Sequence, residues 1–115
     1  MKTLASALTI GLLFSFAPEV HATASMNTCN SSNECRANVV TVYSVGDNGF
    51  VVLAGHIIPS ICTGAAWGYY WSFNLTDSGD KARYATVLSA YLAGQPVELR
   101  TFDSSCHAVT VGLGE

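Results

Sequence analysis

Five short segments of the chain are rich in β-branched and aromatic residues or alternate apolar with polar residues, which is typical of β-strands with one buried face. These predicted strands are residues 39–45, 50–57, 67–75, 97–102 and 106–113. Between the first two, the step Asn48-Gly49 indicates a hairpin, because both residues tolerate positive φ angles. Gly55, within the second segment, predicts a bulge or a close backbone approach.

The third predicted strand carries the densest group of aromatic residues. Strand alternation places one set of its side chains on a single face, namely Trp67, Tyr69, Trp71, Phe73 and Leu75. Tyr70 falls on the opposite face, and Trp67 lies at the end of the strand. The pattern predicts Tyr69, Trp71 and Phe73 in the core, and it leaves Trp67 and Tyr70 available to a ligand.

A helix is predicted over residues 80–93, between the third and fourth strands. Asp77, Ser78 and Asp80 favour a helix start, because they supply capping oxygens and negative charge. Gly94 suits the left-handed position after a helix, and Pro96 cannot continue one. Apolar residues at helical spacing form one predicted buried stripe, consisting of Tyr84, Ala85, Leu88, Tyr91 and Leu92.

The element order is therefore β-β-β-α-β-β, in a chain that is mainly β with one helix. This is the order of the OB-fold, a five-stranded Greek-key barrel, and another five-stranded α+β sandwich is the alternative. We expect an OB-fold-like domain over residues 39–115. A polar N-terminal arm is expected over residues 25–38, where Asn and Ser favour turns.

The first 24 residues have the pattern of a cleavable signal peptide. Lys2 precedes an uncharged apolar run over residues 4–16, and Ala22-Thr23-Ala24 fits a small-x-small cleavage site. Cleavage after Ala22 is the rival site, and a membrane anchor or a buried core helix is the alternative structure. Because the run is shorter than the roughly 20 apolar residues that span a bilayer, we expect a secreted or periplasmic protein without a membrane span.

All four cysteines follow the predicted signal, which in an oxidising compartment indicates two disulfides with three connectivities open. A local bridge between Cys29 and Cys35 is expected in the arm. In an OB barrel the third and fifth strands run side by side and parallel. Cys62, just before the third strand, would then meet Cys106 at the start of the fifth. The cysteine spacing fits no zinc pattern, so no metal is expected.

The charges are few and slightly acidic. After the predicted signal the chain has four basic and seven acidic residues, a balance of −3. Clustered Lys and Arg bind phosphate backbones, and the sequence has no such cluster, so nucleic acid is not expected as a partner. A largely neutral polar surface suits a neutral ligand or a protein partner.

The sequence offers little for catalysis. His56 lies in an apolar segment and His107 lies beside a predicted disulfide, so both are interpreted as structural histidines. A nucleophile elbow and a Gly-rich phosphate loop are both missing from the sequence. We therefore expect a protein without catalytic residues or cofactors. An enzyme would require His56, His107 and a carboxylate to converge in one cleft.

Residues 82–99, ARYATVLSAYLAGQPVEL, resemble the helix and following strand of the pentameric binding subunits of subtilase cytotoxin and typhoid toxin. Those subunits are OB-folds that form rings and bind host sialoglycans. They continue after this strand into a long aromatic and proline-rich segment, whereas here Phe102 leads through a tight turn to Cys106. None of their sugar-binding residues matches a position in this chain.

The resemblance implies an OB-fold, secretion, a homopentameric ring and a separate catalytic subunit. Taken with the residues, it predicts a secreted non-enzymatic binding module that is similar to a bacterial toxin binding subunit. Glycans are the candidate ligands, and Trp67 and Tyr70 are the candidate binding residues. The alternative is a periplasmic or secreted protein-interaction domain, such as an enzyme inhibitor.

Overall fold

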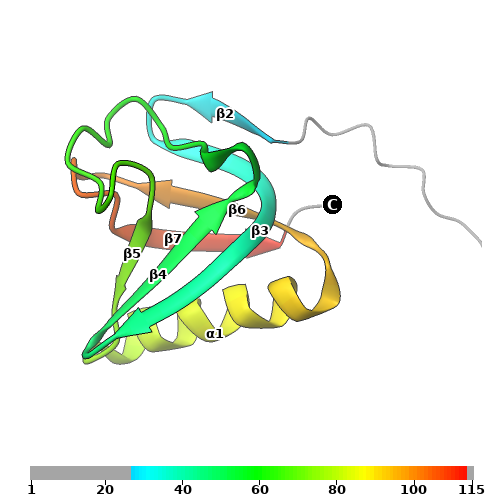
Figure 1. The fold of residues 1–115 in the computed structure, drawn as a ribbon, viewed down its shortest axis with the longest axis vertical. Helices are drawn as coiled ribbons and strands as arrows, with labels where there is room; N and C mark the ends of the chain where they lie inside the picture. Colours follow the sequence, from blue (N-terminus) through cyan, green and yellow to red (C-terminus); the bar gives the residue numbers. More distant parts are fainter. Residues whose placement is uncertain (1–26, 114–115) are drawn as a thin grey trace, which may run out of the picture.

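The computed structural model describes residues 27–113, so the predicted signal peptide and its cleavage site lie outside the described residues. The described chain is mainly β, with six antiparallel strands in an open sheet (Figure 1). The sheet order is β5-β4-β3-β6-β7, with β2 paired to β3. The strands are β2 (Thr28–Ser31), β3 (Glu34–Val45), β4 (Asn48–Leu53), β5 (Trp71–Asn74), β6 (Pro96–Thr101) and β7 (Ala108–Leu113).

The long strand β3 organises the sheet. Its first residues pair with β2 on one side and β6 on the other, and its second half pairs with β4. The register shifts between Val39 and Thr41, where the strand changes partners. Such an irregularity bends a strand and increases its twist. The curved β3 therefore wraps the sheet around one core, with helix α1 (Ser78–Ala93) along one side (Figure 1).

The ends of β5 and β7 also approach each other. Ser72 and His107 form an isolated parallel bridge, and the backbone N–H of Ser72 donates to Cys106 O at 2.9 Å. This contact brings the third predicted strand beside the start of the fifth in the parallel orientation that the sequence indicated.

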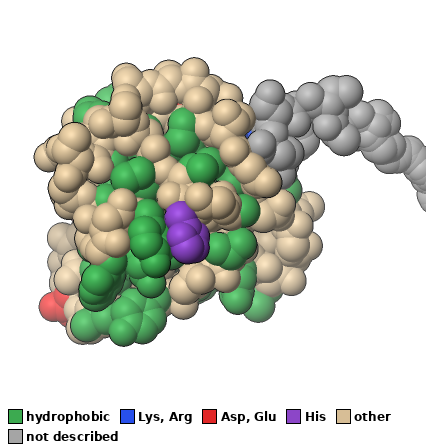
Figure 2. All heavy atoms as spheres, turned by 45° about the horizontal axis from the view of Figure 1, so that its top comes forward, with side chains coloured by type: hydrophobic (Ala, Val, Ile, Leu, Met, Phe, Trp, Pro, Cys, Tyr) green, Lys and Arg blue, Asp and Glu red, His purple; other side chains and the backbone are tan. Residues whose placement is uncertain are grey.

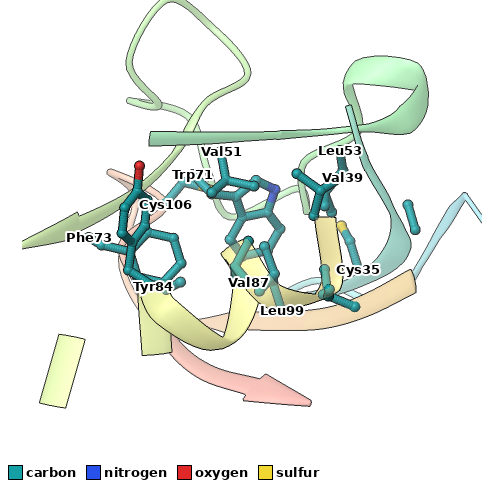
Figure 3. Packing of buried hydrophobic residues seen from close by; sticks show 14 of the residues in the cluster. Cys35, Val39, Val51, Leu53, Trp71, Phe73, Tyr84, Val87, Leu99 and Cys106 are labelled. Atoms are coloured by element: carbon teal, nitrogen blue, oxygen red, sulfur yellow. The ribbon is translucent and has the colours of Figure 1, made fainter. Parts of the chain in front are cut away.

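The core lies between the curved sheet and α1 (Figure 3). Trp71 and Phe73 are fully buried, as their alternation predicted, and the Trp71 indole N–H donates to Ile57 O at 3.3 Å. Figure 3 shows Trp71 among residues from three strands and the helix, namely Val39, Val51, Leu53, Val87 and Leu99. Trp71 and Phe73 are the two largest fully buried side chains in the described residues, and such aromatic rings contribute strongly to a core.

Helix α1 begins and ends as the sequence indicates, but it buries a different face. Asp77 caps it by accepting a hydrogen bond from Asp80 N at 2.9 Å, and Gly94 ends it with a φ of 68°. The buried residues are Asp80, Tyr84, Val87 and Ala90. The predicted stripe is wrong at three of its members, since Ala85, Tyr91 and Leu92 are exposed. The apolar spacing does not predict the buried face of α1, because that face begins with the charged Asp80 and ends with the small Ala90.

The helix approaches β4 closely at Gly49. A Cβ at this position would lie 2.6 Å from Tyr84 Cε1, so only glycine fits without displacing the ring. Asn48 and Gly49, predicted as the turn, are instead the first residues of β4, and the turn lies two residues earlier. The loop residues are Gly46 and Asp47, with Gly46 at a φ of 57°.

Three predicted boundaries need correction. β4 ends at Leu53 rather than at residue 57, and the 3₁₀ turn Ala54–His56 follows, with Gly55 at a φ of 79°. β5 starts at Trp71 rather than Trp67, because residues 66–70 form a tight turn. Residues 28–31 and 34–38, expected as a polar arm, are instead strands in the sheet. Residues 28–31 pair with β3 and residues 34–38 pair with β6, and this backbone pairing outweighs the turn preference of their Asn and Ser side chains.

Both predicted cysteine pairs lie at disulfide distance. Cys29 pairs with Cys35, and Cys62 pairs with Cys106 across 44 residues of chain, with a Cα–Cα separation of 5.0 Å. The second pair ties the long loop between β4 and β5 to the segment before β7. Among the described residues, α1 falls short of the length and apolarity needed to cross a bilayer, as does the shorter 3₁₀ turn.

Candidate binding site: an aromatic pocket

An open pocket of about 290 Å³ lies beside the turn that precedes β5. Its lining consists of four aromatic residues, Tyr43, Trp67, Tyr69 and Tyr70. Tyr43 comes from the second half of β3, and the other three come from the turn over residues 66–70. The fold thus brings together residues that are more than 20 positions apart in the sequence.

The turn projects Trp67 outward. The N–H of Gly68 donates to Ala65 O, and the N–H of Tyr70 donates to Ala66 O, both at 3.0 Å. This tight path sets Trp67 at a φ of 51° and Gly68 at 88°. A left-handed conformation strains a bulky L-residue by about 1–2 kcal/mol. The same Trp side chain is 63% exposed, so it gains little burial in return.

Neighbouring rings hold the Trp67 indole in place. It makes edge-to-face contacts with Phe50 at 5.3 Å, Tyr70 at 4.9 Å and Tyr43 at 6.1 Å between ring centroids. Edge-to-face pairs each add about 0.5–1.5 kcal/mol beyond their buried area. The indole is therefore exposed but already held in one position. Less side-chain entropy would then be lost when a ligand binds to it.

His56 packs against Tyr69, one of the residues that line the pocket. Its ring stacks on Tyr69 with centroids 4.3 Å apart and planes only 2° from parallel. His56 also has a positive φ, 55°, immediately after the left-handed Gly55. Two bulky residues in strained backbone conformations thus flank one pocket, and strain of this kind concentrates at functional sites.

The loop that carries the pocket is anchored to the body of the protein. The N–H of Ile61 donates to Ser32 O at 3.1 Å, and the N–H of Gly64 donates to Ser104 O at 2.7 Å. Cys62 is paired with Cys106. These three links hold a segment that contains little regular secondary structure of its own.

The pocket carries no formal charge, since its lining is aromatic throughout. Of the basic residues in the described part of the chain, Arg83 binds Asp80 and Arg100 binds Glu34, each at 2.5 Å. Figure 2, which brings the upper side of Figure 1 forward, shows hydrophobic side chains around a histidine with hardly any charged groups. This face suits a neutral ligand better than an ionic one.

The structure brings the two predicted binding residues, Trp67 and Tyr70, into one pocket. Tyr69, predicted as core, lines the pocket instead, because the tight turn breaks the strand alternation before Trp71. Sequence reasoning also missed Tyr43 and the supporting rings of Phe50 and His56. The alternation of residues in β3 does not indicate that Tyr43 would lie beside the turn over residues 66–70.

A second polar cluster joins α1 to β5 and to the segment before β7. The Asp80 carboxylate, only 2% exposed, accepts from the N–H of Asn74 at 2.6 Å and from Arg83 at 2.5 Å. His107 Nε2 lies 2.5 Å from the same carboxylate, and His107 Nδ1 lies 4.0 Å from Asp103. Asp80 was expected to favour the helix start through its charge. In the structure its side chain is buried and contacts residues of other elements, namely Asn74 and His107.

The electrostatics of this cluster favour the ionised carboxylate. Burial raises the pKa of Asp80, but the hydrogen bonds from Asn74, Arg83 and His107 outweigh it and hold the pKa below 3.8. The pKa of Asp103 is likewise lowered, since hydrogen bonds from His107 and Ser105 overcome its partial burial.

The two histidines that follow the predicted signal lie in different surroundings. His107 converges with carboxylates, but His56 stacks on Tyr69 in the aromatic pocket and is not part of the cluster. Within residues 27–113, no group of three or more His, Cys, Asp or Glu side chains could hold a metal ion. The Asp80 carboxylate is engaged by Asn74 N, Arg83 and His107, and these contacts join α1 to β5 and to the segment before β7.

Comparison of the chain with models of known protein families, with curated proteins and with solved structures finds no match.

Proposed function

We propose that this protein is a secreted, non-enzymatic binding module that recognises glycans through the aromatic pocket. The observation that carries the proposal is Trp67, which is held in a strained conformation, braced by three rings and yet 63% exposed. Folding alone does not favour such a side chain, whereas aromatic faces rimmed by hydroxyls suit the alternating CH and OH groups of a sugar.

The polar atoms of the pocket support the same proposal. Among the described residues, the hydroxyls of Tyr43, Tyr69 and Tyr70 have no hydrogen-bond partner, and neither does the indole N–H of Trp67. Each can donate to a ligand hydroxyl, and each tyrosine can also accept. Aromatic side chains with a few convergent polar groups are a common lining of small-ligand sites.

The finer fold and the assembly are part of the proposal. The parallel contact between Ser72 and His107 supports closure of the sheet into an OB-fold-like barrel. Two cysteine pairs support folding in an oxidising compartment, outside the cell or in the periplasm. By its likeness to toxin binding subunits over residues 82–99, the module would form a ring beside a separate catalytic subunit.

A glycan array probed with the oxidised protein tests the proposal. We expect binding to a subset of glycans and its loss in Trp67→Ala, with the melting temperature unchanged within a few degrees. Tyr91→Ala is the matched control, because Tyr91 is an aromatic side chain 41% exposed on α1, outside the pocket. Absence of binding across neutral and charged glycans would reject the glycan proposal and favour the protein-interaction alternative.

A further inference from the structure

We propose that the aromatic pocket takes an uncharged terminal hexose and discriminates against carboxylated sugars. This inference rests on the proposed glycan-binding function and concerns the chemical class of the sugar. It is carried by the lining of the pocket and by the positions of the charged residues in the described chain.

The exposed indole of Trp67 can attract a neutral sugar. The CH groups on one face of a pyranose carry partial positive charge, whereas the face of an aromatic ring is negative because of its quadrupole. A hexose stacked on Trp67 would thus gain both apolar burial and electrostatic attraction. The hydroxyls of Tyr43, Tyr69 and Tyr70 lie around the same pocket and are available for hydrogen bonds to the sugar.

A sugar that carries a carboxylate is disfavoured in the same pocket. Burying an anion is costly unless a charged partner or several N–H donors compensate for its lost hydration. The pocket lining has no Lys, Arg or His. Arg83 and Arg100 are held by Asp80 and Glu34, and Lys81 lies in the first turn of α1.

The surrounding charge acts in the same direction. The negative faces of the lining rings repel an anion, and the protein as a whole carries a net charge of −3. His56, at the margin of the pocket, is stacked face to face on Tyr69. The pocket therefore combines attraction for a neutral sugar face with no compensation for a carboxylate.

The test compares one glycoprotein bearing complex N-glycans before and after enzymatic removal of its terminal sialic acids. This treatment exposes a neutral terminal hexose and leaves the rest of the glycan unchanged. By surface plasmon resonance we expect at least tenfold tighter binding to the desialylated form. The gain should be absent in Trp67→Ala and retained in Tyr91→Ala.

Ionic strength supplies a second measurement. Attraction to an anionic sugar would weaken as salt screens it, whereas stacking on a neutral sugar should change less than twofold between low and high NaCl. Equal or tighter binding to the sialylated form would overturn the inference and leave glycan binding intact. Failure to bind either form, together with silence on a panel of neutral glycans, would overturn both proposals.

Discussion

Asp80→Asn tests the role of the buried carboxylate in joining α1 to the sheet. The substitution keeps the shape of the side chain but removes its charge and replaces one acceptor oxygen with a donor. In the native protein that carboxylate accepts from Asn74 N and contacts both Arg83 and His107 at 2.5 Å. The amide at residue 80 would point hydrogens at one of these donors and leave it without an acceptor.

The expected cost follows from these contacts. A hydrogen bond to a charged group contributes about 1.5–3 kcal/mol, and breaking a buried ion pair costs roughly 3–5 kcal/mol. Arg83 and His107 are each about one-third exposed, so water can recover part of their loss. We therefore expect a loss of about 3 kcal/mol, equivalent to roughly 12–24 °C in melting temperature for a domain of this size.

Urea denaturation followed by circular dichroism measures this loss in the free energy of unfolding. The control is Asp103→Asn, since the Asp103 side chain is about half exposed and lies 4.0 Å from the His107 ring. The amide oxygen of Asn can still accept the hydrogen bonds that Asp103 Oδ1 accepts from Ser105 and from the backbone N–H of His107. We expect Asp103→Asn to change stability by less than about 1 kcal/mol. A loss below 1 kcal/mol in Asp80→Asn, or equal losses in the two variants, would refute the assigned role.

The pH dependence gives an independent check of the same cluster. Because the pKa of Asp80 is lowered below 3.8 in the folded protein, its contribution is fully present above the unfolded pKa. That contribution is lost as the pH falls through the folded pKa. The stability difference between the native protein and Asp80→Asn should therefore be largest near pH 6 and shrink steadily below about pH 4. A difference that stays constant down to pH 2 would contradict the linkage.

The remaining predictions concern the close packing at Gly49 and the Cys62–Cys106 disulfide. Gly49→Ala should lose about 1–3 kcal/mol in urea denaturation, because its Cβ would lie 2.6 Å from the Tyr84 ring. Gly112→Ala should stay within about 1 kcal/mol, because its Cβ would lie an ordinary 3.8 Å from Glu98 Oε1. Equal effects of the two substitutions would show that the Tyr84 ring moves freely. Replacing Cys62 and Cys106 together by Ser should cost about 4 kcal/mol on the chain-entropy model. The same double variant should weaken glycan binding at temperatures where it remains folded, and unaltered binding would mean that the other loop contacts position the pocket unaided.

Local patterns were sufficient to predict the class of fold. The alternation around Trp71 and Phe73 predicted a buried strand, and both residues are fully buried. Asp77 and Gly94 bound the helix because capping depends on the few nearest backbone groups. The pairing of Cys62 with Cys106 was predicted from the element order read as an OB barrel, and the two residues lie at disulfide distance. Each of these predictions draws on forces that act within one element or on the order in which elements occur.

The sequence did not reveal which faces meet. The helix buries Asp80, Val87 and Ala90 because the sheet offers Asn74 N and His107 to the carboxylate, and these partners come from other elements. The strand expected to begin at Trp67 begins at Trp71, since a tight turn with two left-handed residues precedes it. Residue preferences for turns and strands are small, and tertiary contacts override them.

The sequence by itself determined a mostly β chain with one capped helix, four cysteines in two pairs and a surface poor in charge. The aromatic residues were visible as a dense group, with Trp67 and Tyr70 as its candidate binding members. Only the tertiary structure decided that Tyr43 joins them and that Trp67 stands exposed on a strained turn. The physical reason is that a pocket depends on which distant segments a curved sheet brings together, and no periodicity within one segment records that.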